Sequence, residues 1–569
     1  MKKRGGAADE LLFVPLGGAG EIGMNLALYG VGGRWLMVDC GMTFADESLP
    51  GVDIVVPDPE FIAARKDDLV GLVLTHAHED HLGAVAHLWE RLGCPVYATP
   101  FAAALLRRKL AEAGLESQVP LDIVETGKPV DLDPFTVTWI AVAHSIPEAH
   151  ALAIETPQGV VIHSGDWKID PEPVVGPRTD EAAFRRWGEA GVLAFVGDST
   201  NVFVTTDGGS EGSLRGSLAE IVAAKRGRVC ITSFASNVAR IATVGEVARA
   251  TGRRLVVAGR SFERILACAR ETGYLAGLPP LVDEDEAGYL PPDEALYLVT
   301  GCQGEARGAL SRIVMGEHKA LHLEAGDTLI FSSRQIPGNE RDIARIMDRC
   351  ALDGVEVVTW RDALVHVSGH PVRDDLVAMY GWVRPKIAVT VHGEARHLAA
   401  HAKVAAETGI AQTVAGRNGE VIRLAPGRAA KVDHVPVGRL AIEQGRAVPL
   451  DSPMIRERRK VAFNGAAVVA LVLDLSGDVV ADPAVAAIGW HEDPEAGRIE
   501  MQRAIRAAVE GLAGAKRLDD GAVAEAARRA VRKLAPEGRR PLIDVQILRL
   551  DGRSRVVYED AAQETEEAQ

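Results

Sequence analysis

The sequence predicts an α/β protein with a metal site at one edge of a sheet, an inserted α/β domain and a small C-terminal α+β domain. Four apolar, strand-like segments each end in histidine or aspartate residues. A strand–helix–strand rhythm runs through residues 228–259, inside the interval between two of these segments. A further strand and an amphipathic helix follow residue 460.

The densest group of ligand-type side chains directly follows the apolar segment 72–74. His76 and His78 come from the strand end, and the helix that opens near Leu82 carries Asp80 and His81 towards a second position. Imidazole nitrogen and carboxylate oxygen together suit zinc, with manganese as an alternative. A solvated polar loop is the competing interpretation, and the residues downstream disfavour it.

Three later segments supply further ligands. His144 follows the strand-like residues 136–142, Asp166 ends the segment 160–165, and His392 follows 387–391. Taken alone, either histidine would more often be a structural core residue. Because every one of them follows an apolar strand, we expect them to meet at one sheet edge as a metal site.

This arrangement resembles the metallo-β-lactamase superfamily, in which a four-layer αββα sandwich carries two metals. The resemblance implies one metal on His76, His78 and His144, a second on Asp80, His81 and His392, and Asp166 as the bridge between them. It also implies that Asp39 supports the ligands from behind, although a turn or helix-capping role is the alternative. The metals expected are two divalent ions of zinc type, with Mn²⁺ or Mg²⁺ as alternatives.

Five ordered segments narrow the resemblance to the β-CASP nucleases and the bacterial ribonuclease J family. They are Gly197–Asn201, Ser233–Asn237, Gly301–Glu305, Ile336–Glu340 and His366–His370. Two features depart from the family pattern: Cys302 stands where serine is expected, and the segment 202–215 diverges.

Because His392 must return to the site formed by His76 through Asp166, the intervening residues predict an insertion. We expect a metallo-β-lactamase domain over 1–208 and 371–430, a β-CASP domain over 209–370, a linker over 431–460, a C-terminal domain over 461–555 and a disordered acidic tail over 556–569.

The resemblance implies a metal-dependent ribonuclease with 5′-to-3′ exonuclease and endonuclease activity, acting in mRNA decay and rRNA maturation. Asp80 and Asp198 would act with His370, which would protonate the leaving 3′ oxygen while Asp198 orients it. A structural hydrogen bond is the alternative for His370. The expected pocket for the RNA and its 5′-phosphate consists of Ser233, Ser236, Asn237, Arg260, His366, Ser368 and Gly369. The serines and the asparagine could instead cap turns.

Three other classes of function share parts of the pattern. A hydrolase of small esters or thioesters would have the His76–His81 cluster but needs neither the insertion nor His370. A DNA-directed β-CASP nuclease would tend to have an apolar residue at the position of His392. A non-enzymatic scaffold would be expected to have lost ligands, and none is missing from this sequence.

Composition sets the remaining expectations. The 569 residues are 47% hydrophobic with a formal net charge of −16, so an RNA site must use local positive charge. Six scattered cysteines indicate reduced core residues. The basic N-terminus has no apolar stretch behind it, and the apolar run 466–473 is too short to span a bilayer. We therefore expect a cytoplasmic protein without membrane contact. Its expected partners are single-stranded RNA, preferably with a 5′-monophosphate, further copies of itself as a homodimer or homotetramer, and RNA-decay proteins.

Overall fold

The computed structural model describes residues 9–46, 48–336, 338–489 and 494–550, and the chain divides into two compact units. The larger unit comprises the residues up to 44 together with 54–447, and the smaller comprises 45–53 and the residues from 448 onward. The acidic tail expected over 556–569 lies outside the described residues, as do residues 551–555.

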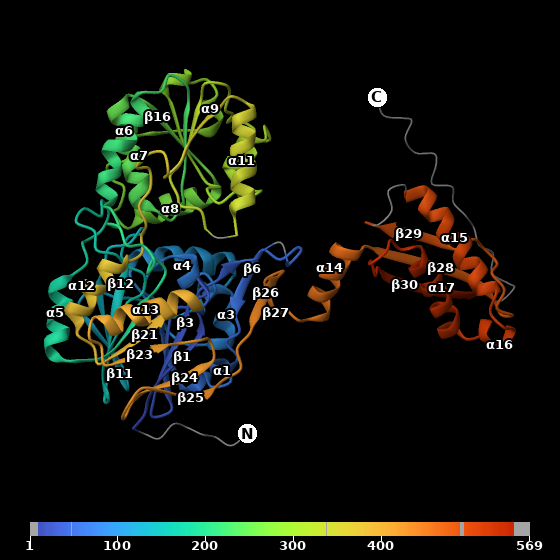
Figure 1. Ribbon diagram of the computed structural model, residues 1–569, viewed down its shortest axis with the longest axis horizontal. Helices are drawn as coiled ribbons and strands as arrows, with labels where there is room; N and C mark the ends of the chain where they lie inside the picture. Colours follow the sequence, from blue (N-terminus) through green and yellow to red (C-terminus); the bar gives the residue numbers. More distant parts are fainter. Residues whose placement is uncertain (1–8, 47, 337, 490–493, 551–569) are drawn as a thin grey trace. The chain divides into compact units, whose positions relative to one another are not determined.

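Two mixed sheets, each with antiparallel and parallel strand pairs, pack face to face and form the base of the larger unit (Figure 1). The first sheet consists, in spatial order, of β25 (Ala430–His434), β24 (Glu420–Ala425), β1 (Leu11–Gly17), β3 (Leu26–Val31), β4 (Arg34–Val38), β7 (Leu69–Val73), β8 (Val96–Ala98) and β9 (Leu121–Ile123). The second consists of β10 (Pro129–Leu132), β11 (Phe135–Ala141), β12 (His150–Thr156), β13 (Gly159–His163), β14 (Val192–Asp198), β21 (Ile387–Val391) and β23 (Gln412–Ala415). Phe13 and Leu36 of the first sheet share one buried cluster with Trp139 and Ile154 of the second.

Helices cover the outer face of each sheet. The first sheet is covered by α3 (Val85–Leu92) and α4 (Pro100–Glu112), and the second by α5 (Glu181–Ala190), α12 (Arg373–Val383) and α13 (Ala395–Glu407). Local signals set their ends: Asp180 caps α5 by accepting from the Ala183 amide (2.9 Å), and Gly93 ends α3 in the left-handed region. The αββα sandwich implied by the resemblance is confirmed.

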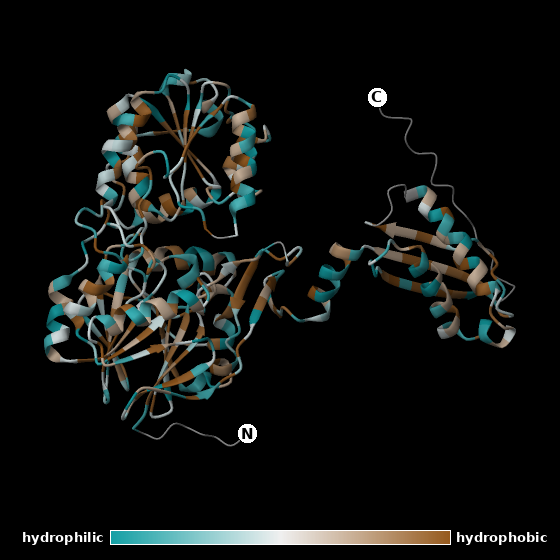
Figure 2. Ribbon diagram, viewed as in Figure 1, coloured by the Kyte–Doolittle hydropathy of each residue, from teal (hydrophilic) through white to brown (hydrophobic). Residues whose placement is uncertain are grey.

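The inserted domain is a wholly parallel six-stranded sheet between two layers of helices. Its strands are, in spatial order, β17 (Leu281–Val282), β16 (Arg254–Ala258), β18 (Ala295–Val299), β15 (Val229–Thr232), β19 (Thr328–Phe331) and β20 (Glu356–Val358). One face packs against α6 (Leu214–Ala223), α7 (Val238–Thr251) and α8 (Arg260–Glu271), and the other against α9 (Glu284–Ala287), α10 (Ala309–Val314) and α11 (Glu340–Leu352). Figure 2 shows apolar strands inside and polar outer helix faces, as this layering requires. The α/β insertion predicted from the βαβ rhythm is confirmed.

Two crossover segments join this domain to the sandwich. The outgoing segment 199–213 ends in η2 (Glu211–Ser213), and the returning segment runs from the end of β20 to α12. They touch at a bridge between Asn201 and Val372, and Lys168 of the sandwich donates to the Gly209 carbonyl (2.8 Å). The returning segment therefore carries residues 366–370 from the inserted sheet to the edge of the sandwich.

The stretch 431–460 differs from the expected linker. It contains most of β25, which pairs with β24, and β26 (Arg439–Glu443), which pairs with β6 (Ile54–Pro57); β27 (Arg446–Pro449) follows. Leu440 and Ala441 are buried by this pairing. Exposed charges on the outer side of these strands give the sequence its linker-like composition.

Short elements complete the unit: β2 (Ala19–Gly20), β5 (Thr43–Phe44), β22 (Gly393–Glu394), α1 (Glu60–Ala63), α2 (Glu79–Leu82), η1 (Lys66–Asp68) and η3 (Pro292–Glu294).

The smaller unit is an α+β fold around its own core. Its sheet consists of β29 (Ala484–Ile488), β28 (Ala466–Asp474) and β30 (Leu542–Leu550), and its helices are α14 (Pro453–Asn464), α15 (Pro494–Glu510), α16 (Gly514–Arg517) and α17 (Asp520–Leu534). Met501, Ile505 and Val509 pack in one cluster with the strand residues Val469 and Leu471, as the helical stripe predicts. Among the described residues, no helix combines the length and apolar character needed to cross a membrane.

Candidate metal centre

The strand ends of the sandwich bring every expected metal ligand to one place. His76 and His78 follow β7, Asp80 and His81 lie in α2, and three further residues come after β11, β13 and β21: His144, Asp166 and His392. They form two overlapping groups in which the ligand atoms all lie within 4.8 Å of one another. Asp166 belongs to both groups and therefore occupies the position expected of a bridge.

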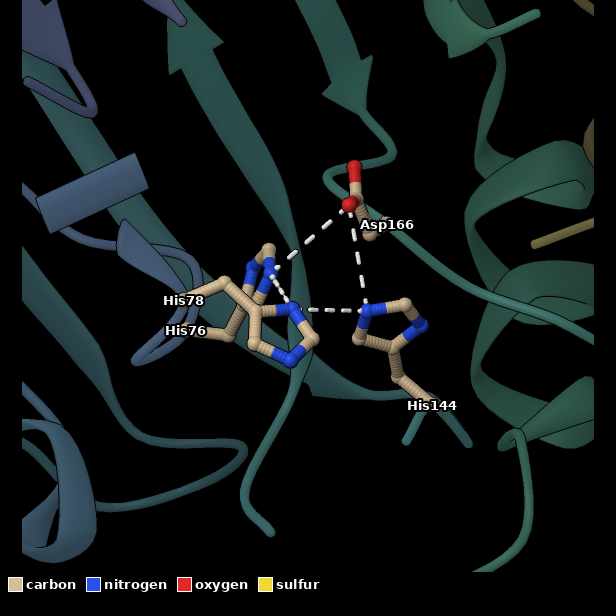
Figure 3. A group of neighbouring side chains, drawn as sticks. All are labelled: His76, His78, His144 and Asp166. Atoms are coloured by element: carbon tan, nitrogen blue, oxygen red, sulfur yellow. Dashed lines mark hydrogen bonds and ion pairs between the residues drawn. The ribbon is translucent and has the colours of Figure 1, made fainter. Parts of the chain in front are cut away.

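The first group consists of His76, His78, His144 and Asp166 (Figure 3). Nδ1 of His78 lies 3.1 Å from Nε2 of His76 and 3.0 Å from Nε2 of His144. Oδ2 of Asp166 lies 3.8 Å from each of these Nε2 atoms. Three imidazole nitrogens and one carboxylate oxygen thus converge on a single point.

The second group consists of Asp80, His81, Asp166 and His392. Oδ1 of Asp166 lies 3.2 Å from Nε2 of His81 and 2.9 Å from Nδ1 of His392. Oδ2 of Asp80 lies 3.7 Å from Nε2 of His81 and 3.4 Å from Nε2 of His392. Asp80 is the more exposed member, so this group lies on the open side of the site.

The spacing and chemistry of both groups fit divalent metal ions. A zinc–nitrogen bond of about 2.0–2.1 Å places neighbouring tetrahedral ligands about 3.3 Å apart, which is within the range of the distances above. Among the described residues, Asp166 Oδ1 and His392 Nε2 are buried without a hydrogen-bond partner. Both atoms face other ligand-type groups, Asp166 Oδ1 at 2.9 Å from His392 Nδ1 and His392 Nε2 at 3.4 Å from Asp80 Oδ2, and a bound cation would satisfy them.

Supporting contacts orient the histidines. Asp39 accepts from Nδ1 of His81 (2.7 Å) and from the amide and hydroxyl of Thr75 (2.8 Å each). His144 donates from Nδ1 to the carbonyl of Gly369 (2.6 Å). In both cases the partner occupies Nδ1, so Nε2 is the ring nitrogen that faces Asp166. Gly369, expected beside the RNA, therefore also contacts an expected metal ligand, and a Cβ there would lie 2.8 Å from the His144 ring.

The histidines of the two groups have pKa values that are shifted in opposite directions. Burial lowers the pKa of His76 and His144 well below the ordinary value, and that of His78 to about 4. Burial acts in the same direction on His81 and His392, but Asp166 and the neighbouring carboxylates outweigh it and raise the pKa of both. The first group thus holds neutral imidazoles, which is the form that binds metals.

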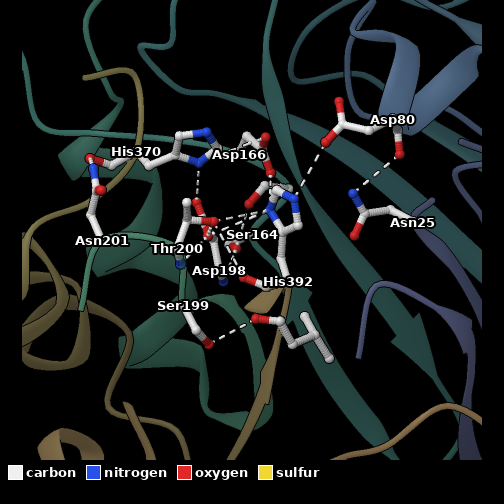
Figure 4. A network of polar contacts seen from close by, with 12 residues as sticks. Asn25, Asp80, Ser164, Asp166, Asp198, Ser199, Thr200, Asn201, His370 and His392 are labelled. Atoms are coloured by element: carbon white, nitrogen blue, oxygen red, sulfur yellow. Dashed lines mark hydrogen bonds and ion pairs between the residues drawn. The ribbon is translucent and has the colours of Figure 1, made fainter. Parts of the chain in front are cut away.

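The Asp198–His370 pair lies beside the metal groups (Figure 4). Nδ1 of His370 lies 2.8 Å from Oδ2 of Asp198 and 3.8 Å from Oδ2 of Asp166. Burial lowers the pKa of His370, but Asp198 and Asp166 outweigh it, so the net shift is upward. The surroundings therefore favour the protonated form of this imidazole, which lies at the edge of the two groups, where a general acid would be needed.

Several residues that sequence reasoning assigned no role hold this pair in place. Thr200 donates its hydroxyl to Oδ1 of Asp198 (2.7 Å), and Asn201 donates to Oγ of Ser368 (2.7 Å) and to the His370 carbonyl (3.2 Å). Asn25 lies beside the second group, with Nδ2 3.0 Å from His81 Nε2. Thr200 and Asn201 directly follow Asp198 in the sequence, which is the signal that could have indicated them.

The expected 5′-phosphate residues lie along the carboxyl edge of the inserted sheet and on the returning segment. Ser233, Ser236 and Asn237 follow β15, exposed Arg260 begins α8 after β16, and His366, Ser368 and Gly369 lie on the return to α12. Asn237 caps α7 by accepting from the Arg240 amide (2.8 Å), so its carbonyl oxygen already has a partner. Burial and then Arg240 lower the pKa of His366 well below the ordinary value, which makes this residue a neutral hydrogen-bonding group.

Comparisons with protein families cover most of the chain. Residues 23–232 match the metallo-β-lactamase superfamily, and residues 226–350 match the β-CASP domain of ribonuclease J. Residues 354–415 match the RNA specificity domain of Zn-dependent metallo-hydrolases, and residues 453–550 match the ribonuclease J C-terminal domain. The matched regions follow one another in the order of the structural domains.

Individual relatives give the same result. The chain is 46% identical over 551 residues to ribonuclease J of Sinorhizobium meliloti, covering 95% of this chain and 98% of the relative. It is 37% identical over 535 residues to ribonuclease J of Mycobacterium tuberculosis, covering 93% and 95%. A solved structure of a protein of unknown function from Enterococcus faecalis V583 aligns with 73% of this chain and 100% of its own, with a TM-score of 0.52 at 15% identity; this likeness concerns the fold alone.

Proposed function

Because this chain belongs to the ribonuclease J family, it is a metal-dependent ribonuclease, and we propose that it hydrolyses RNA at a two-metal centre of zinc type. The observation that carries the proposal is the convergence of seven ligand-type side chains on two overlapping groups that share Asp166. The ribonuclease J domains disfavour a small-ester hydrolase and a DNA-directed nuclease, and the complete ligand set disfavours a scaffold.

The ligand assignment follows the two groups. His76, His78 and His144 would hold one ion, Asp80, His81 and His392 the other, and Asp166 would bridge them. When bound, two divalent cations would acidify a water molecule and offset the negative charge that develops on the phosphate. Asp39 and the Gly369 carbonyl keep His81 and His144 in the orientation that this binding requires. Zinc fits the nitrogen-rich first group, and manganese or magnesium is the alternative for the more carboxylate-rich second group.

His370 would supply the proton that the leaving 3′ oxygen needs. Its Nδ1 donates to Asp198, so a proton on Nε2 is free to move to the substrate. Asp198 stabilises the imidazolium, and Thr200 fixes the carboxylate by donating to its other oxygen. Replacing Asp198 would therefore remove both the charge and the orientation that His370 depends on.

The remaining expectations extend this proposal. The enzyme would degrade single-stranded RNA from a 5′-monophosphate and cleave it internally, in mRNA decay and rRNA maturation in the cytoplasm. Ser233, Arg260 and Ser368 would contribute to the 5′-phosphate pocket, supported by the place of Ser233 and Arg260 at the carboxyl edge of the inserted sheet and of Ser368 on the returning segment. A homodimer or homotetramer, and RNA-decay proteins as partners, belong to the same proposal.

The test uses purified full-length protein and one RNA prepared with a labelled 5′-monophosphate or 5′-triphosphate. With Mn²⁺ or Zn²⁺, the monophosphorylated RNA should be degraded faster and release labelled mononucleotide, and a chelator should stop the reaction. Asp166→Ala should lose activity together with metal, measured by elemental analysis, because it removes a ligand shared by both groups. Activity that survives complete metal removal would contradict the proposal.

A further inference from the structure

A turn at the carboxyl end of β20 presents an exposed indole between two arginines. Trp360 is 41% exposed, and the guanidinium carbons of Arg334 and Arg361 each lie 5.2 Å from its ring centroid. We propose that this Arg334–Trp360–Arg361 cluster is a stacking platform that binds a base of single-stranded RNA outside the scissile dinucleotide. The inference rests on the proposed ribonuclease function and adds a substrate-binding site to it.

The turn that carries Trp360 is closed by its own hydrogen bonds. The amide and the hydroxyl of Thr359 donate to Oδ2 of Asp362 (2.8 and 2.7 Å), and the Asp362 amide donates to the Thr359 carbonyl (3.0 Å). Trp360 and Arg361 are the two residues between these partners. A turn fixed in this way holds an indole in place before any ligand arrives, which lowers the entropic cost of binding. The same hydrogen bonds from Thr359 also occupy the Asp362 carboxylate, which is the nearest negative charge on this turn.

Arg334 is supplied by a different loop, which is also anchored. Nε2 of Gln303 donates to the Arg334 carbonyl (3.0 Å), and Oε1 of Gln303 accepts from the Ile336 amide (2.9 Å). Gln303 therefore fastens the loop after β19 to the loop after β18. This contact gives a role to the Gly301–Glu305 segment, which the catalytic centre does not use.

The platform lies at the carboxyl edge of the inserted sheet, which is the edge that the crossover segments connect to the sandwich. Both crossover segments join the sheet at its carboxyl edge, and Arg240 donates to the Val365 carbonyl (3.4 Å) on the way from Trp360 to His370. Other exposed apolar side chains share this edge, namely Phe234, Ile336 and Leu364. Trp360 and His370 lie ten residues apart on the same returning segment, so an RNA strand that enters the expected metal centre beside His370 could extend towards the platform.

The chemistry of the cluster suits nucleic acid. Every base has a face that can stack on an indole, and guanidinium groups pair with phosphates. The arginine–indole contacts are weak at an exposed site, so an incoming base can displace one guanidinium and leave it to a phosphate. Neither Arg334 nor Arg361 forms a salt bridge within 4 Å to another described residue, although the charge of Arg361 contributes to lowering the pKa of the neighbouring Asp362 carboxyl. In a chain with a net charge of −16, such local cations are where an RNA backbone would be attracted.

The test compares wild type with Trp360→Ala and Trp360→Phe on 5′-monophosphorylated RNAs from two to twenty nucleotides long. Tyr289→Ala is the matched control, because Tyr289 is 90% exposed but precedes β18 at the opposite edge of the same sheet. On long RNA, kcat/KM of Trp360→Ala should fall about 5- to 150-fold, the effect of one lost stacking contact. The dinucleotide and the small diester bis(p-nitrophenyl) phosphate should be hydrolysed at the wild-type rate. Trp360→Phe should recover part of the loss.

The possible results test the stacking platform and the proposed ribonuclease function separately. Equal kcat/KM of Trp360→Ala and wild type at every RNA length would overturn the platform, and so would an equal loss on the small diester, which would indicate damage to the catalytic centre. A wild-type enzyme that hydrolyses the small diester but no RNA would contradict the proposed function itself. If the platform is correct, Arg334→Ala should also flatten the salt dependence of kcat/KM on long RNA, because one phosphate contact is lost.

Discussion

At the residue scale, the contact between Asp198 and His370 distinguishes the role that we propose for His370, proton transfer, from metal binding. His370 belongs to a group of possible ligands with Asp166 and His392, but its Nδ1 is occupied by Asp198 at 2.8 Å. We predict that His370→Ala lowers kcat about 10²–10⁴-fold, the range for a lost general acid. Its metal content should stay at the wild-type value, whereas His392→Ala should lose metal as well as activity. Elemental analysis beside single-turnover rates distinguishes the two, and equal metal loss in both variants would place His370 among the ligands.

Some residues of the site could be predicted from the sequence, and others could not. Histidine and aspartate residues at strand ends were sufficient to predict which side chains converge in the structure, because few structural roles need so many ligand-type side chains there. Their supports were harder to find. The Gly369 carbonyl that orients His144 is a backbone atom, and 225 residues separate the two partners in the chain. No local pattern encodes such a contact, since it depends on how the returning segment packs.

At the scale of elements, Arg240 joins the two crossover segments to the inserted sheet. Its buried guanidinium donates to Oε1 of Glu211 (2.8 Å) on the outgoing segment, to the Ser332 carbonyl (2.8 Å) after β19, and to the Val365 carbonyl (3.4 Å) on the returning segment. We predict that Arg240→Ala lowers the free energy of unfolding by about 3–5 kcal/mol, because Glu211 is left as an unpaired buried charge. Urea unfolding measures this loss. Arg240→Met combined with Glu211→Gln should recover part of it, and a single variant as stable as wild type would contradict the assignment.

Helices and strands could be predicted from the sequence where the apolar residues have a strong periodicity. They could not be predicted where apolar and polar residues are mixed without a clear period. The βαβ rhythm of 228–259 was recognisable because β15 and β16 are short apolar strands separated by one helix. In residues 431–460 the apolar positions are interspersed with charges, glycine and proline, and only the strand partners β24 and β6 make their pairing visible. Those partners lie about ten residues away in one case and nearly 400 in the other, so sheet formation here is a tertiary effect.

At the scale of the whole molecule, buried neutral histidines make stability depend on pH. His401 lies between the Tyr380 hydroxyl (2.8 Å from Nε2) and the Ser199 hydroxyl (2.9 Å from Nδ1), and Ser199 donates to the Val391 carbonyl beside His392. Burial lowers the pKa of His401 to about 4. The network accordingly links the catalytic edge of the second sheet to α12 and α13, and it holds His401 without a positive charge.

The sign of the pH effect follows from this lowered pKa. Below the ordinary value of about 6.5 the unfolded chain binds a proton at His401 that the folded chain does not, so stability is present above that pH and is lost as the pH falls towards 4. Between pH 7 and pH 5 this residue should remove about 2 kcal/mol from the free energy of unfolding. Between pH 7 and pH 5, the free energy of unfolding of His401→Gln should therefore fall by about 2 kcal/mol less than that of wild type. Urea unfolding at each pH measures the difference. The same exchange at the partly exposed His322 controls for the chemical change, and identical slopes for His401→Gln and wild type would show that His401 titrates alike in both states.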